Sequence, residues 1–325
     1  MKELTVIVPV YNGEKTIGRT LGSLVNQTSD DIEILVINDG SMDDTENIVN
    51  SYADKYANIT LINKKNGGIA SARNTGINNI NTKYFGFLDS DDYVEPTMFE
   101  KMLAKIKKDD SDLCVCNFYW EWPNKQRLQV EGPYSTPNEM ITKLFATLWN
   151  KIYKTELIKR FDLSFPDGYR YEDSYFLYCL AANEIKISFV SESFVHYMQT
   201  SSSITHTFND KVKDMIHVFE EIQKYYINHD LYDKYHDELE FLFAKFFLGN
   251  SFLRTCQIND KEERNKTLQM SWDIIEKNYP NFKDNKYVKE MGGKKGLYYQ
   301  LINKSNYMFI GNFLHILGIL NKNLY

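Results

Sequence analysis

Residues 4–39 read LTVIVPVYNGEKTIGRTLGSLVNQTSDDIEILVIND, and this stretch decides the fold. Two apolar runs, 4–11 and 32–39, each have the length and composition of a strand that is covered on both faces. Between them, Ile17 and Leu21 begin an apolar series at helical spacing, which predicts an amphipathic helix. The order of strand, helix and strand predicts a βαβ unit with parallel strands.

The same alternation continues along the first third of the chain. Three further strands are predicted at 58–65, 84–91 and 112–120. We therefore expect an α/β fold with a Rossmann-like, mainly parallel sheet flanked by helices. Farther along, the pattern becomes helical to the end of the sequence. The predicted domains are an α/β domain at 1–207 and an all-α region at 208–325.

The composition bounds the function. The 325 residues are 43% apolar and 25% charged, as in a globular protein, and the formal net charge of −6 argues against a nucleic-acid partner. The four cysteines form neither a disulfide framework nor a zinc motif. The N-terminus lacks the pattern of a signal peptide, and no apolar run is long enough to span a bilayer. We expect a cytoplasmic protein, with the inner face of the membrane as an alternative location.

Carboxylates follow two of the predicted strands. Asp39 ends the second strand, and the stretch FGFLDSDDYVEP (85–96) places Asp89, Asp91 and Asp92 after the fourth. In a parallel sheet, ligands bind beyond the carboxyl ends of the strands, so these acids lie where a ligand would be expected. A divalent cation, Mn²⁺ or Mg²⁺, would offset the repulsion within the cluster and would also bind substrate phosphates. Two enzyme classes use an Asp-x-Asp pattern in this way: aspartyl-phosphate phosphatases and metal-dependent glycosyltransferases.

Several motifs in order favour the second class. The chain from about residue 4 to 205 resembles the family 2 glycosyltransferases, which are inverting enzymes of the GT-A fold. The resemblance rests on VIVPVYNGEKTIGRTLGSLVNQT, EILVINDGSMDDT, NGGIASARNTGI, FGFLDSDDYVEP, WNKIYKTELI and YEDSYFLYCLA. No such resemblance is found for the C-terminal 115 or so residues.

The resemblance implies a set of donor-binding residues. Asp39 would contact the nucleotide base, beside Pro9 and Tyr11 on the first strand. Arg73 would meet the base or the diphosphate, and Gly68 would let the backbone approach the nucleotide. The structural alternatives are a turn aspartate, a surface arginine and a glycine that only supplies a turn.

The resemblance also implies the catalytic and metal-binding groups. Asp89 would lie by the ribose, Asp91 would bind the metal, and Asp92 would orient the metal's surroundings or the substrate. Asp173 would be the base that takes the proton from the acceptor hydroxyl, with Glu172 beside it on the substrate side. The alternative for the Glu-Asp pair is that both residues cap the following helix.

Three further residues are weaker candidates. His196 would reach the metal or the diphosphate, although a single histidine near a strand end is more often structural. Trp149 would stack on an acceptor sugar, and Lys151 would bind an anion. Both could equally be packing residues at the edge of the core.

These observations predict a metal-dependent inverting glycosyltransferase. It would move a sugar from a nucleotide-diphosphate donor, expected to be a UDP-sugar, to a hydroxyl of a saccharide acceptor in bacterial surface glycan synthesis. The alternatives are a nucleotide-sugar-binding protein without catalysis and an Asp-x-Asp phosphatase. For the aromatic-rich C-terminal helices, packing ranks first, a homo-oligomer contact second, and contact with the membrane surface or a lipid-linked acceptor third.

Overall fold

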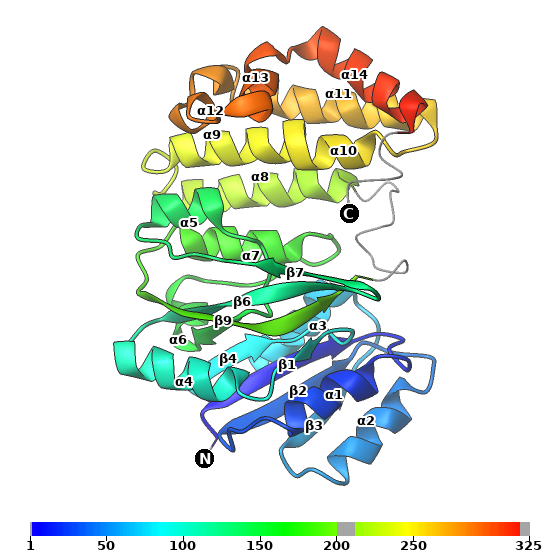
Figure 1. Ribbon diagram of the computed structural model, residues 1–325, viewed down its shortest axis with the longest axis vertical. Coiled ribbons are helices and arrows are strands. Elements are labelled where there is room, and N and C mark those ends of the chain that lie inside the picture. The colour runs from blue at the N-terminus through cyan, green and yellow to red at the C-terminus, as the bar shows by residue number, and fades with distance from the viewer. Residues whose placement is uncertain (1, 200–211, 319–325) are drawn as a thin grey trace. The chain divides into compact units, whose positions relative to one another are not determined.

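The structure is a computed structural model, and it describes residues 2–199 and 212–318 (Figure 1). By its internal contacts the chain divides into two compact units. The first unit comprises Met1–Gly168 with Glu172–Ser201, and the second comprises Tyr169–Tyr171 with Ser202–Tyr325. The domain boundary expected between residues 207 and 208 lies outside the described residues and stays a prediction.

Within the described residues, the first unit is built on a nine-stranded sheet with the order β3-β2-β1-β4-β8-β6-β9-β5, in which β7 also pairs with β6. The strands are β1 (Leu4–Val10), β2 (Ile32–Asn38), β3 (Ile59–Asn63), β4 (Tyr84–Phe87), β5 (Tyr93–Val94), β6 (Leu113–Trp122), β7 (Lys125–Gln129), β8 (Lys151–Lys154) and β9 (Ile187–Met198).

The parallel part of the sheet is the part that the N-terminal βαβ pattern predicts. Strand β1 pairs in parallel with β2 and with β4, and β2 pairs in parallel with β3. Beyond β4 the sheet is mixed, because β8 is antiparallel to both β4 and β6. The strand expected at 112–120 is therefore present as β6, but it joins the parallel strands through an antiparallel neighbour.

Helices cover both faces of this sheet. They are α1 (Ile17–Val25), α2 (Thr45–Ala53), α3 (Ile69–Asn78), α4 (Met98–Asp109), α5 (Pro137–Lys143), α6 (Glu156–Arg160) and α7 (Glu172–Ala181). Alternate residues of β1, such as Val6 and Val8, join α1 and α4 in one buried cluster. The opposite face of β1 meets α3 so closely that a Cβ on Gly76 would lie 2.5 Å from Ile7 Cγ2. The α/β architecture expected from the sequence is thus confirmed.

The second unit is helical. Its elements are α8 (Val212–Asn228), α9 (His236–Lys245), the π-helical segment η2 (Phe246–Asn250), α10 (Ser251–Thr255), α11 (Lys261–Asn278), the 3₁₀ turn η3 (Phe282–Asp284), α12 (Lys286–Lys289), α13 (Gly293–Leu301) and α14 (Lys304–Leu317). Helix α14 packs on α11 and α10. Across the described ranges, no helix combines the length and the apolar character that crossing a membrane requires.

Candidate active site

The predicted carboxylates lie at one edge of the sheet. Strand β2 ends at Asn38, so Asp39 follows it directly, and the Asp89–Asp92 cluster follows β4. Strand β1 lies between β2 and β4 and runs parallel to both. The two groups of acids therefore flank the carboxyl end of β1, which is the edge where ligands bind in sheets of this kind.

Asp39 is buried and fixes the start of α3. One carboxylate oxygen, Oδ1, accepts hydrogen bonds from Lys64 Nζ at 2.7 Å and from the Gly67 amide at 3.0 Å, and Oδ2 accepts from the Gly68 amide at 2.8 Å. A carboxylate offers about four acceptor positions, so one position on Oδ2 receives no donor from the described residues and could accept from a ligand. Lys64 was not predicted, although its place just after β3 puts it beside the end of β2.

Glycine is needed at two positions near Asp39, one in the loop after β2 and one just before α3. Gly68 precedes α3 with φ of 87°, and Gly40 has φ of 74°, which are left-handed conformations that side chains disfavour. A Cβ on Gly40 would also lie 2.8 Å from the Asn66 amide nitrogen. Nearby, Pro9 lies within β1, and Tyr11, just past its end, leaves 47% of its surface exposed. The loops after β1 and β2 and before α3 thus combine a close backbone approach with an exposed aromatic ring.

Arg73 connects the two carboxylate groups that the sequence predicted separately. It projects from α3, is only 5% exposed, and pairs through Nη2 with Asp89 Oδ1 at 2.9 Å and through Nη1 with Glu172 Oε1. The Cζ atom of its guanidinium also lies over the Phe165 ring, 5.7 Å from the ring centre. The Nε atom has no hydrogen-bond partner among the described residues. This arginine therefore brings the acids after β4 next to the start of α7.

Of the two acids at the start of α7, Glu172 is buried and Asp173 is partly buried, and burial raises the pKa values of both. Burial raises the pKa of Glu172 to about 7, although the charge of Arg73 opposes the shift. Burial also raises the pKa of Asp173, whose carboxylate accepts a hydrogen bond from the Ser174 amide at 2.7 Å. A carboxylate with a raised pKa is a stronger base than an ordinary one, so this pair suits proton transfer near neutral pH.

The carboxylates that follow β4 also have few positively charged neighbours. Burial, together with the charge of Asp89, raises the pKa of Asp91 to about 6. Asp92 is fully buried, and its Oδ2 has no hydrogen-bond partner in the described part of the chain. Burial and the charge of Asp91 raise its pKa well above the ordinary value. Hard oxygen donors that lack a counter-charge fit a bound Mg²⁺ or Mn²⁺.

Helix α1 holds the backbone of this acidic loop. Thr20 Oγ1 bonds to the carbonyl oxygens of Ser90 at 2.9 Å and Asp92 at 2.7 Å. Arg19 Nη2 donates to the Asp91 carbonyl, and its guanidinium lies 5.2 Å from the centre of the Tyr93 ring. Neither residue was predicted from the sequence, because both lie on a helix whose apolar stripe accounts for the local pattern.

The structure gives His196 carboxylate partners on both sides. Its Nε2 lies 2.9 Å from Glu95 Oε1, and its Nδ1 lies 3.1 Å from Glu121 Oε2. The imidazole also stacks on the Tyr93 ring, with 4.3 Å between the ring centres. A bond from His196 to a metal would require one of these contacts to break, and the metal role stays a prediction.

Trp149 and Lys151 lie in the interior of the first unit. The Trp149 ring is 3% exposed and packs edge-on against Phe118, 4.6 Å away between ring centres. The Lys151 ammonium is fully buried and pairs with Glu131 Oε1 at 2.9 Å. In this structure neither side chain is open to an acceptor, so the arrangement favours their packing roles.

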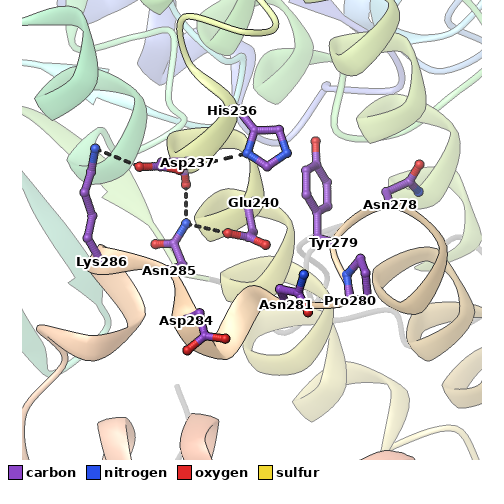
Figure 2. Close-up of a pocket in the computed structure, with 10 residues that line it drawn as sticks. All are labelled: His236, Asp237, Glu240, Asn278, Tyr279, Pro280, Asn281, Asp284, Asn285 and Lys286. Atoms are coloured by element: carbon purple, nitrogen blue, oxygen red, sulfur yellow. Dashed lines mark hydrogen bonds and ion pairs between the residues drawn. The ribbon is translucent and has the colours of Figure 1, made fainter.

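The second unit contains a polar pocket of about 420 Å³, shown in Figure 2. There, His236, Asp237 and Glu240 place possible metal-ligating atoms within 4.8 Å of one another. The two carboxylates already have partners: Asp237 pairs with Lys286 at 3.0 Å, and Glu240 accepts from Asn285 at 2.9 Å. Because a lysine already pairs with Asp237 and an amide already donates to Glu240, the pocket gives no separate indication of a ligand.

Comparison with known proteins identifies the family of the first unit. The family described as "Glycosyl transferase family 2" matches residues 5–167. The chain belongs to this glycosyltransferase family. The protein called uncharacterized glycosyltransferase EpsJ, from Bacillus subtilis (strain 168), is 33% identical over 217 residues, which cover 62% of each chain. The chain therefore spans less than two thirds of the length of this curated relative.

Two solved structures share the fold. S. aureus TarS 1–349, in complex with UDP-GlcNAc, has a TM-score of 0.77 at 24% identity and covers 97% of this chain and 92% of its own. A mannosyltransferase from Pyrobaculum calidifontis, in complex with GDP-Man and Mn²⁺, has a TM-score of 0.53 at 14% identity and covers 98% of this chain and 88% of its own. The GT-A fold expected from the sequence is thereby confirmed, and the likeness to TarS extends into the helical region.

Proposed function

We propose that this protein is a metal-dependent inverting glycosyltransferase that uses a nucleotide-diphosphate sugar, with UDP as the expected nucleotide. The observation that carries the proposal is the position of Arg73, which is paired with both Asp89 and Glu172. Through this residue, Asp89 and the two acids at the start of α7 lie around one buried guanidinium. The UDP-GlcNAc bound to TarS and the GDP-Man and Mn²⁺ bound to the mannosyltransferase support the donor class and the metal.

On the donor side, the free acceptor position of Asp39 would receive the imide N–H of a uracil base, with Pro9 and Tyr11 beside the ring. Gly68 would let the nucleotide come close to the protein backbone at the start of α3. Asp89, which Arg73 holds in place, would accept from a ribose hydroxyl.

A divalent cation fits the carboxylate of Asp91, with Asp92 behind it, and when bound it would neutralise the charge that develops on the leaving diphosphate. The chain's own task is to hold these carboxylates together against their repulsion. The bonds from Thr20 to the backbone of the acidic loop serve that purpose.

On the acceptor side, Asp173 would take the proton of the attacking hydroxyl. Inversion requires attack on the anomeric carbon from the face opposite the diphosphate, so this base must lie apart from the metal-binding carboxylate. Burial raises the pKa of Asp173, which strengthens it as a base. Glu172 would orient the same hydroxyl while Arg73 holds its carboxylate.

The first experiment tests donor and metal together. The full chain is screened against UDP-, GDP- and dTDP-sugars for nucleotide release, with Mn²⁺, with Mg²⁺ and with EDTA. We expect UDP to raise the melting temperature only when a divalent metal is present. If no nucleotide stabilises the protein with either metal, the proposed donor site is wrong. Phosphate release from aryl phosphates would favour the Asp-x-Asp phosphatase instead.

The second experiment tests the base. Asp173→Asn should lower the transfer rate by about 10²–10⁴-fold, because general-base catalysis contributes that much. It should leave the metal-dependent thermal shift by UDP within about 1 °C of the wild-type shift. Asp167→Asn, in the loop that precedes α7, is the matched control. A protein that binds UDP but transfers no sugar even as the wild type would be a binding protein without catalysis.

The biological setting is part of the same proposal. The acceptor would be a saccharide hydroxyl of a growing bacterial surface glycan, and the protein would work in the cytoplasm or at the inner face of the membrane. The similarity to EpsJ and the fold shared with TarS support a bacterial glycosyltransferase of this kind.

A further inference from the structure

The outer faces of α13 and α14 expose large apolar side chains that no part of the described second unit covers. These side chains, which we call the C-terminal apolar face, are Leu297, Leu301, Phe309, Phe313, Ile316 and Leu317. Phe309 is 69% exposed, and its ring stacks on that of Phe313 instead of on the core, with 6.0 Å between the ring centres. In Figure 1, α13 leads into α14 on the side of the second unit that faces away from α8, with α11 beneath α14.

The exposed side chains follow helical spacing, so each helix presents them as one stripe. Leu297 and Leu301 are four residues apart on α13, and Phe309 and Phe313 are four apart on α14. The other side of α14 is already used for folding, because Tyr307 and Gly311 are buried where the helix packs on α10 and α11. Helix α14 therefore has two apolar sides. One side is buried against α10 and α11, and the other carries the exposed stripe.

The segment that carries this face has charges of one sign. Residues 291–325 contain four lysines and neither Asp nor Glu, whereas the chain average of 44 acids in 325 residues would give about five in a stretch of that length. Lys294 lies three residues before Leu297, on the same side of α13, and Lys295 is next to it. Neither lysine has a carboxylate partner within the ranges that the structure describes. Lys304 differs, because it pairs with Asp273 and Glu276 of α11 at 3.3 Å.

This charge distribution discriminates between possible occupants. If a second copy docked through the same face, Lys294 and Lys295 of both copies would be covered in an interface to which residues 291–325 contribute no acid. Covering a charge without a partner is costly. A bilayer with anionic headgroups offers both an apolar layer for the exposed rings and phosphates for the lysines.

We propose that the outer face of α13 and α14 binds to the surface of an anionic lipid bilayer. The apolar side chains would enter the boundary between headgroups and acyl chains, and Lys294 and Lys295 would contact lipid phosphates. The aromatic pair and the leucines supply the apolar contact, and the lysines supply the preference for anionic lipid. The inference does not depend on the proposed transfer reaction.

The test uses the full chain and vesicles of phosphatidylcholine with 0% or 30% phosphatidylglycerol, and binding is measured by flotation. We expect binding to the anionic vesicles, weaker binding in 1 M NaCl, and little binding to phosphatidylcholine alone. Lys294→Gln with Lys295→Gln should lower the partition coefficient on the order of 25-fold, from about fivefold per lysine. Phe309→Ser with Phe313→Ser should lower it by more than about tenfold.

Matched control variants show whether a loss of vesicle binding is specific to the C-terminal apolar face or follows the loss of any exposed lysine or apolar side chain. Lys108→Gln with Lys159→Gln removes two exposed lysines of the first unit, and Ile227→Ser removes an exposed apolar side chain of α8. The controls should bind vesicles as the wild type does. Equal binding by the controls and the test variants, or no binding to anionic vesicles, would overturn the proposal.

Sedimentation without lipid tests independently whether a second copy of the chain covers this face. A monomer at micromolar concentration would support the proposal that the face binds a bilayer. A dimer that Phe309→Ser with Phe313→Ser abolishes would instead assign the face to a second copy. Because the lysine variant leaves every apolar side chain in place, it keeps the test valid if the phenylalanine variant fails to fold.

Discussion

The buried Arg73 offers the sharpest test of how the candidate site is held together. Arg73→Met keeps most of the side-chain length but removes the charge that faces Asp89 and Glu172. Removing one partner of a buried ion pair costs about 3–5 kcal/mol. We expect a loss near 3 kcal/mol, because Glu172, whose pKa is already about 7, can take up a proton instead of staying charged. That loss is more than a hundredfold in the unfolding equilibrium constant.

The pH dependence gives this prediction a direction. The pKa of Glu172 is raised on folding from 4.5 to about 7, so its contribution to stability is complete below pH 4.5 and is lost as the pH rises through about 7. Without Arg73, which lowers this pKa, the loss extends to higher pH. The stability gap between Arg73→Met and the wild type should therefore be smaller at pH 6 than at pH 8.

Guanidinium unfolding followed by tryptophan fluorescence can measure this gap, because Trp120, Trp122 and Trp149 all belong to the first unit. Arg160→Met, at an exposed arginine of α6, is the matched control and should change little. Adding Glu172→Gln to Arg73→Met should remove most of the extra loss above pH 7. If Arg73→Met unfolds at the same denaturant concentration as Arg160→Met at both pH values, the buried network does not stabilise the fold as argued.

Three further predictions concern the metal site, a buried ion pair and the sheet. The pKa of Asp91 is about 6, so below that pH a metal must displace a proton from its carboxylate. The Mn²⁺-dependent stabilisation by UDP should therefore be much weaker at pH 5 than at pH 7.5. Equal shifts in melting temperature at the two pH values would contradict this. Lys151→Met should destabilise the fold by about 3 kcal/mol while the folded enzyme keeps the wild-type acceptor KM, whereas a raised KM would restore Lys151 as an acceptor contact. Gly76→Ala, which drives a Cβ into Ile7, should cost about 1–3 kcal/mol in a urea melt. Gly18→Ala in α1, where a Cβ meets no described atom within 4 Å, should instead stabilise by about 0.5–1 kcal/mol, and a reversed order would refute the packing argument.

The sequence predicted the parts of the molecule that depend on local pattern and on sheet topology. Apolar runs and helical stripes locate β1 to β4 and the helices between them. Parallel pairing then places Asp39 and the Asp89–Asp92 cluster at the same edge without any knowledge of contacts. This inference succeeds because every parallel strand in a sheet points its carboxyl end the same way.

Contacts between distant segments were not predictable in the same way. Lys151 follows Trp149 and Asn150 in a stretch that reads equally well as a surface loop. Its burial depends on Glu131, which lies twenty residues earlier. The partners of His196 are similarly remote, since Glu95 and Glu121 come from separate parts of the chain. A long polar side chain can be buried only if such partners exist, and no local pattern reveals them.

Burial, together with the small number of cations near the carboxylates, explains why several acids of the site have raised pKa values. Two arginines, Arg73 and Arg19, face a larger number of carboxylates, which are Asp89, Asp91, Asp92, Glu172 and Asp173. With too few cations, a buried carboxylate becomes neutral only by binding a proton, and the raised pKa values follow from that. A divalent metal at Asp91 would add positive charge on the donor side, whereas the burial of Asp173, which is the largest cause of its raised pKa, would not change. Asp173 would keep its raised pKa and its capacity to take a proton from the acceptor.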